Sequence, residues 1–110
     1  MNIVEIRQDD VNGFVTSMPA EVKVIPVATV EVAQVALREL LKKRFAEFDV
    51  EVEPVVDDKN YLSIDNNEPV EGAYDDHYTL CTLKGPDSSV PVADLFIEES
   101  PVQITWFLVD

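Results

Sequence analysis

The chain has 110 residues, and 22 acidic against 8 basic side chains give it a formal net charge of −14. A surface of that sign repels nucleic acid and anionic membranes and attracts basic proteins. Because 46% of the residues are hydrophobic, an acidic disordered tail is excluded and a folded core is expected. This length predicts a single domain over residues 1–110.

The N-terminal region alternates between polar and apolar residues, as half-buried β-strands do. The first strand is predicted at residues 2–7. The second comprises residues 14–18 and 21–27, with Asn12-Gly13 supplying the turn between the two strands. The pattern therefore predicts an N-terminal β-hairpin.

A helix is predicted over residues 30–48. Thr29 is a suitable N-cap residue, and Glu31 lies in the first turn, where the helix dipole favours an acid. Apolar residues at spacings of three and four are expected to form its buried face: Val32, Val35, Ala36, Leu40, Leu41, Phe45 and Phe48. The basic residues are expected on or beside the exposed face: Arg38, Lys42, Lys43 and Arg44.

The second half of the chain contains several shorter candidate strands. Residues 49–56 begin with a period of two, and Pro54 predicts an edge strand or a bulge there. Strands are also predicted at residues 60–64 and 77–84, while residues 92–98 are compatible with a strand or a short helical turn. Residues 102–109 are apolar enough for a central strand, with most of that run in the core.

This order of elements predicts an α+β fold: one amphipathic helix, at about residues 30–48, packed on a mainly antiparallel sheet of four to six strands. A hairpin, a helix and then three or four strands are compatible with a β-grasp-like order, as in ubiquitin-like proteins. They are also compatible with a cystatin-like sheet wrapped on a helix. No motif in the sequence assigns the chain to either family.

The acidic residues are concentrated between residues 49 and 76, where ten acids and one lysine give a net charge of −9. Alternate residues of a strand share a face at a spacing of roughly 6.7 Å, which is comparable to the separation of neighbouring phosphates along a nucleic-acid strand. The spacing favours an interpretation of these acids as phosphate mimics. Two alternatives remain: a half-exposed strand whose acids only provide solubility, and a surface adapted to high salt. The expected partner-binding residues are Asp49, Glu51, Glu53, Asp57, Asp58, Asp75 and Asp76.

Catalytic and metal-binding patterns are weak. Asp57 and Glu68 have the spacing of the first and last ligands of a calcium loop, but the intervening ligands and the glycine are missing. Asp75, His77 and Cys81 would share a strand face but are too few for a zinc signature. His77 is the only histidine and would have to serve every proton-transfer role. We therefore expect no catalytic residue, no metal and no cofactor.

The sequence predicts a non-enzymatic, protein-binding inhibitor of the kind encoded by phages and mobile elements, which blocks a nucleic-acid-binding enzyme by mimicking DNA phosphates. The alternatives are a small virion structural or assembly protein, or adaptor, and an immunity protein or antitoxin. The expected partner is a basic protein surface, without direct binding to nucleic acid or membrane. One cysteine and an N-terminus without signal-peptide features predict a cytoplasmic location, in the host if the protein is phage-encoded.

Overall fold

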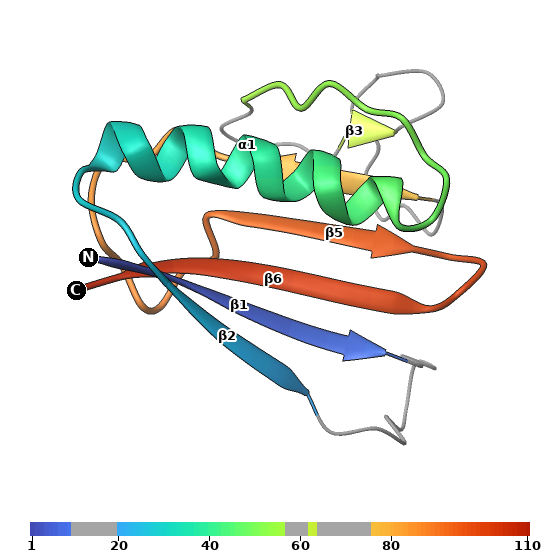
Figure 1. The fold of residues 1–110 in the computed structure, drawn as a ribbon, viewed down its shortest axis with the longest axis horizontal. Helices are drawn as coiled ribbons and strands as arrows, with labels where there is room; N and C mark the ends of the chain where they lie inside the picture. Colours follow the sequence, from blue (N-terminus) through green and yellow to red (C-terminus); the bar gives the residue numbers. More distant parts are fainter. Residues whose placement is uncertain (10–19, 57–61, 64–75) are drawn as a thin grey trace.

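The computed structural model describes residues 1–9, 20–56, 62–63 and 76–110. Within these ranges the chain forms one helix and six strands, drawn in Figure 1: β1 (Asn2–Asp9), β2 (Glu21–Pro26), α1 (Val30–Ala46), β3 (Leu62–Ser63), β4 (His77–Leu80), β5 (Ala93–Ile97) and β6 (Val102–Val109). The strands form one sheet in the order β2-β1-β6-β5-β4-β3, and every neighbouring pair is antiparallel. The predicted α+β fold, with one helix on an antiparallel sheet, is confirmed.

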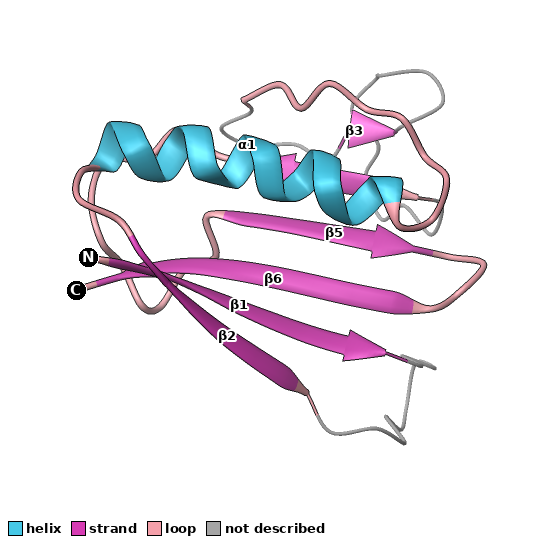
Figure 2. Cartoon of the chain, in the orientation of Figure 1, coloured by secondary structure: helices cyan, strands magenta, loops and turns pink. Residues whose placement is uncertain are grey.

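The centre of the sheet is β6, which pairs with β1 on one side and β5 on the other. Its side chains alternate strictly between buried and half-buried positions, because successive residues of a strand point to opposite faces. Trp106 is fully buried in this strand, as the predicted core position requires. Figure 2 shows α1 running along the sheet, with β2 as the strand farthest from the helix.

The helix begins as predicted: Thr29 has extended backbone angles, and its Oγ1 accepts a hydrogen bond of 3.1 Å from the Val32 backbone N–H. The predicted buried face was partly wrong, since Val32 and Val35 are 49% and 59% exposed. The face that packs on the sheet is instead Ala33, Leu37, Leu41, Arg44 and Phe45. These residues follow spacings of three and four from Ala33, so the apolar stripe is rotated relative to the prediction.

Leu37 and Leu41 enter the same hydrophobic core as the buried side chains of β4, β5 and β6. Full burial of a leucine side chain stabilises a fold by about 1.5–3 kcal/mol. The helix is therefore fixed by the sheet on which it packs and less by its own helical propensity.

Three other predictions were resolved by the structure. Residues 92–98, left open between strand and helical turn, contain the strand β5, and the strand predicted at residues 77–84 ends at Leu80. The predicted strand at residues 49–56 was wrong, because residues 50–56 belong to no strand of the sheet. The predicted strand at residues 14–18 lies outside the described residues.

Candidate functional site

The acidic segment begins at a sharp turn after α1. The Val50 N–H donates to the Phe45 carbonyl at 3.1 Å and the Asp49 N–H donates to the Ala46 carbonyl at 3.2 Å, which together form a Schellman-type helix end. Asp49 has a φ of 60° at this turn. Glycine is the usual residue in such a left-handed position, because it has no Cβ to clash. The sequence therefore places a carboxylate where glycine would cause less strain.

From this turn, the segment continues with alternating exposure. Val50 and Val52 are half-buried and pack against the core, whereas Asp49, Glu51 and Glu53 are exposed. The predicted period of two is thus correct, although the segment lies outside the sheet. Val50 and Val52 pack against the core without joining a strand ladder.

The far end of the segment is attached to the sheet. The Val55 backbone N–H donates a hydrogen bond of 2.9 Å to Oη of Tyr78, in β4. Tyr78 in turn makes an edge-to-face contact with Phe45 of α1, with ring centroids 6.0 Å apart. Asp49, Glu51 and Glu53 are called the carboxylate row below, and the segment that carries them is held at both ends by buried parts of the fold.

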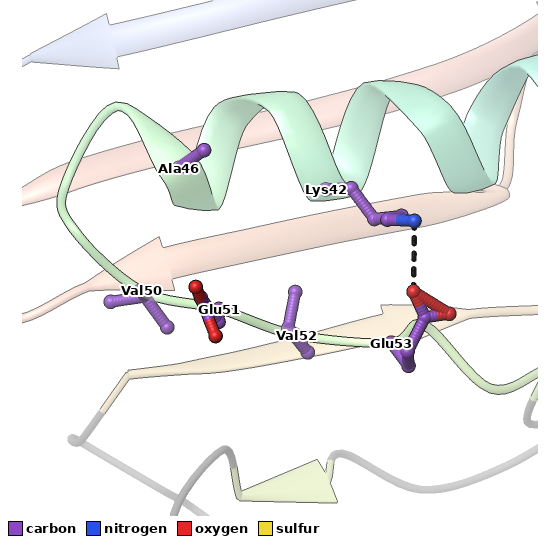
Figure 3. A pocket seen from close by; sticks show the side chains of 6 residues that line it. All are labelled: Lys42, Ala46, Val50, Glu51, Val52 and Glu53. Atoms are coloured by element: carbon purple, nitrogen blue, oxygen red, sulfur yellow. Dashed lines mark ion pairs between the residues drawn. The ribbon is translucent and has the colours of Figure 1, made fainter.

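A groove of about 470 Å³ lies between the last turns of α1 and residues 50–53. Figure 3 shows the side chains that line it: Lys42, Ala46, Val50, Glu51, Val52 and Glu53. Small apolar side chains from both elements thus lie beside two of the predicted carboxylates. The groove can accept an apolar group or the aliphatic stem of a basic side chain, with acids beside its charged end.

One residue of the groove is basic. Lys42 Nζ lies 2.8 Å from Glu53 Oε1, and this hydrogen bond and the negative charge of Glu53 raise the pKa of Lys42. The Glu53 side chain is nevertheless 82% exposed. Exposed ion pairs contribute little to stability, so Glu53 can exchange Lys42 for a base of a partner.

The remaining predicted contacts are not brought into this row within the described residues. Asp76 lies just before β4, and its Oδ1 accepts a hydrogen bond of 2.9 Å from the Glu98 backbone N–H. It thereby supports the turn between β5 and β6. Asp57, Asp58 and Asp75 lie outside the described residues. Of the predicted contacts, the structure therefore describes Asp49, Glu51 and Glu53 as exposed residues of one short segment.

A buried polar cluster joins the sheet to the helix, and the sequence analysis missed it. Glu5 of β1 is 2% exposed and Arg44 of α1 is 6% exposed. Arg44 donates to Glu5 Oε1 through Nε at 3.0 Å, with Nη2 2.8 Å from the same oxygen, and Trp106 Nε1 donates to Glu5 Oε2 at 3.0 Å. The expectation that Arg44 lies on the solvated side of the helix was therefore wrong. The sequence signal that could have revealed this cluster was the alternation of β1, which puts Glu5 on the same buried face as Ile3.

A second arginine extends this cluster to the surface. Arg7 donates to Asp9 at 2.9 Å and to Glu47 at 3.0 Å, and its guanidinium lies 5.8 Å from the centre of the Phe48 ring. The hydrogen bond to Asp9, followed by the charges of Asp9 and Glu47, raises the pKa of Arg7 despite partial burial. These contacts tie β1 to the end of α1, immediately before the turn at Asp49.

A different carboxylate lies on the opposite face of the sheet. Asp94 of β5 stands between Thr79 of β4 and Thr105 of β6, and its Oδ1 is buried without a hydrogen-bond partner among the described residues. Burial raises the pKa of Asp94 to about 6, while the neighbouring His77 opposes the rise. Thr79 also opposes it, although its Oγ1 makes no hydrogen bond of ordinary length.

The described part of the chain contains no group of three or more His, Cys, Asp or Glu side chains that could hold a metal ion. It also contains no helix with the length and apolar character needed to cross a membrane. Comparison of the chain with protein-family models, characterised proteins and solved structures finds no match.

Proposed function

We propose that this chain is a non-enzymatic protein-binding inhibitor, of the kind found in phages and mobile elements. It would block a nucleic-acid-binding enzyme by offering carboxylates in place of phosphates. The observation that supports this proposal is the exposed row of Asp49, Glu51 and Glu53. The left-handed position of Asp49 is compatible with it, because glycine is the usual residue at such a turn and here the position carries a carboxylate.

Binding would proceed in two physical steps. The net charge of −14 attracts a basic surface and speeds the encounter of the two proteins. The apolar groove then supplies contact area beside the charges, through Ala46, Val50 and Val52. Because the row is anchored at both ends, little ordering entropy is lost when the partner binds.

The experiment begins with capture of the partner from a bacterial lysate at low salt, elution at high salt and identification by mass spectrometry. Competition between this protein and duplex DNA for the captured enzyme is then measured by fluorescence anisotropy. The triple variant Asp49→Asn, Glu51→Gln and Glu53→Gln is expected to lose at least about tenfold in affinity, as charge-assisted contacts require.

The matched control neutralises three exposed acids away from the row: Asp87→Asn, Glu99→Gln and Asp110→Asn. It has the same net charge as the triple variant and is expected to compete almost as well as the unmodified protein. Equal losses in the two variants would reject a defined row in favour of general charge. An enzyme that binds this protein and DNA together would reject phosphate mimicry.

One observation favours the alternative of an assembly or adaptor protein. β2 is an edge strand, and its Val22 and Val24 are 59% and 61% exposed. Exposed edge strands pair with other strands. The mass in solution separates the two proposals, since a ring or large oligomer favours assembly and a small discrete species favours the inhibitor.

A further inference from the structure

Within the described residues, the outer edge of β2 has a defined set of backbone groups that pair with no other strand. The Val27 N–H donates to the Met1 carbonyl at 3.0 Å, so Met1 and Val27 form a hydrogen-bonded pair of the β1–β2 ladder. Such pairs alternate with non-hydrogen-bonded pairs along an antiparallel ladder. The backbone groups of Glu21, Lys23 and Ile25 therefore point toward β1, and those of Val22 and Val24 point outward.

Pro26 fits this assignment, because it lies opposite Asn2 in a non-hydrogen-bonded pair, where its missing N–H costs the β1–β2 ladder nothing. The free edge thus offers the N–H and C=O groups of Val22 and Val24, and only a C=O at Pro26. The same alternation adds the backbone of Ala20, an exposed residue just before the strand. A second strand could pair along this edge.

The charges of β2 select both the partner and the register. If a second copy of β2 pairs antiparallel with Val22 opposite Val22, then Glu21 of each copy lies opposite Lys23 of the other. A shift of the register by two residues keeps the same backbone groups at the edge. In one direction it places Glu21 against Glu21, and in the other it places Lys23 against Lys23. Opposite charges across a strand pair are favourable and like charges are unfavourable. A further shift of two residues beyond the Lys23–Lys23 register brings Pro26 opposite Val22, where a hydrogen bond is lost because proline has no N–H.

We propose that two copies of this chain associate edge to edge through antiparallel β2 strands, with Val22 at the two-fold axis and Glu21 paired with Lys23 of the second copy. Each directly opposed pair that faces the edge then exchanges two backbone hydrogen bonds: Val22 with Val22, and Val24 with Ala20. The sheets of the two copies become continuous. This inference is independent of the proposed inhibitor function.

The local charge permits this contact despite the acidity of the whole protein. β1 and β2 together contain three acids (Glu5, Asp9 and Glu21) and two bases (Arg7 and Lys23), a net charge of −1, compared with −14 for the chain. At physiological ionic strength, charges farther than about 8 Å away are largely screened. Repulsion between distant acidic regions is therefore weak at this edge, and added salt weakens it further.

The small contact predicts weak association. A strand of six residues buries far less than the roughly 1,200–2,000 Å² of a stable protein interface. We therefore expect a reversible dimer whose population rises with protein concentration. Sedimentation equilibrium of the full chain over a wide concentration range gives the dimer dissociation constant.

Charge-swap variants test the register. Lys23→Glu places acids opposite each other at both ends of the pairing and is expected to weaken the dimer by roughly tenfold. The double variant Glu21→Lys with Lys23→Glu restores opposite charges and has the same net charge as the unmodified protein. It is expected to restore dimerisation, and thermal unfolding of both variants checks that the monomer remains folded.

A backbone variant tests the edge itself. Val24→Pro removes an outward N–H without touching the β1–β2 ladder and is expected to weaken the dimer by at least about tenfold, whereas Val24→Thr keeps the N–H and the dimer. A chain that stays monomeric at every concentration would overturn the proposal. So would a dimer that is insensitive to Lys23→Glu, or one that the double swap fails to restore. The triple variant of the acidic row must dimerise normally, which separates this proposal from the inhibitor function.

Discussion

The carboxylate of Glu5 and the carboxylates of residues 49, 51 and 53 have opposite environments. Glu5 is 2% exposed, and both of its oxygens accept hydrogen bonds from buried donors on Arg44 and Trp106. Asp49, Glu51 and Glu53 are exposed, and within the described residues Glu53 has an ion pair with Lys42. Burial and hydrogen-bonding partners, more than the number of charges, therefore decide which acids stabilise the fold and which remain available to another molecule.

The largest effect is expected from breaking the buried cluster. Arg44→Ala leaves Glu5 as a buried charge without its counter-ion, and loss of one partner of a buried pair costs about 3–5 kcal/mol of unfolding free energy. Lys43→Ala, at an exposed neighbouring position, is expected to stay within about 0.5 kcal/mol of the unmodified protein. Urea unfolding monitored by Trp106 fluorescence measures both variants. Similar stabilities for the two would show that the buried pair does not hold α1 on the sheet.

A smaller, pH-dependent effect is expected at Asp94, whose burial raises its folded-state pKa from 3.8 to about 6. The folded protein then binds this proton more tightly than the unfolded chain does. The contribution of this proton to the unfolding free energy has its full value below pH 4. It falls by up to about 3 kcal/mol as the pH rises through 6.

Asp94→Asn has no proton to lose. The difference in unfolding free energy between this variant and the unmodified protein is therefore expected to grow in favour of the variant from pH 4 to pH 7. Urea titrations at several pH values measure that difference. A constant difference across this range would contradict a protonatable buried group at this position.

The smallest stability effect is expected at the turn before the acidic row. Asp49→Gly removes the Cβ from a residue with a φ of 60° and is expected to raise the unfolding free energy by about 0.5–1 kcal/mol. The same variant is expected to weaken binding to the captured partner, because it removes one carboxylate of the row. A gain in stability with undiminished binding would remove Asp49 from the binding surface.

Local patterns in the sequence predicted those parts of the fold that depend on neighbouring residues. The Thr29 cap, the alternation of residues 49–53 and the central position of residues 102–109 all follow from short-range chemistry. The period of two could not reveal that residues 50–56 lie outside the sheet. Alternation indicates that every second side chain is buried, but it does not indicate whether the segment pairs with a neighbouring strand.

The buried pair was missed for a related reason. Arg44 was assigned by its charge to the exposed side of α1, although Leu41 and Phe45 lie beside it on the buried face. A buried arginine is stable there because Glu5 lies 39 positions earlier in the chain and contacts it across the helix–sheet interface. Such long-range pairing cannot be deduced from helical periodicity alone. In the candidate site, Asp49, Glu51 and Glu53 were predicted as partner-binding residues, whereas the groove beside them required the three-dimensional fold.

The dependence of partner binding on ionic strength tests the role of the exposed row most directly. The affinity of the captured enzyme for the unmodified protein and for the triple variant is measured from roughly 50 to 300 mM salt. Charge pairing predicts that affinity falls steeply with salt for the unmodified protein and much less for the variant. Equal slopes, or binding that is indifferent to salt, would contradict the claim that Asp49, Glu51 and Glu53 replace phosphates.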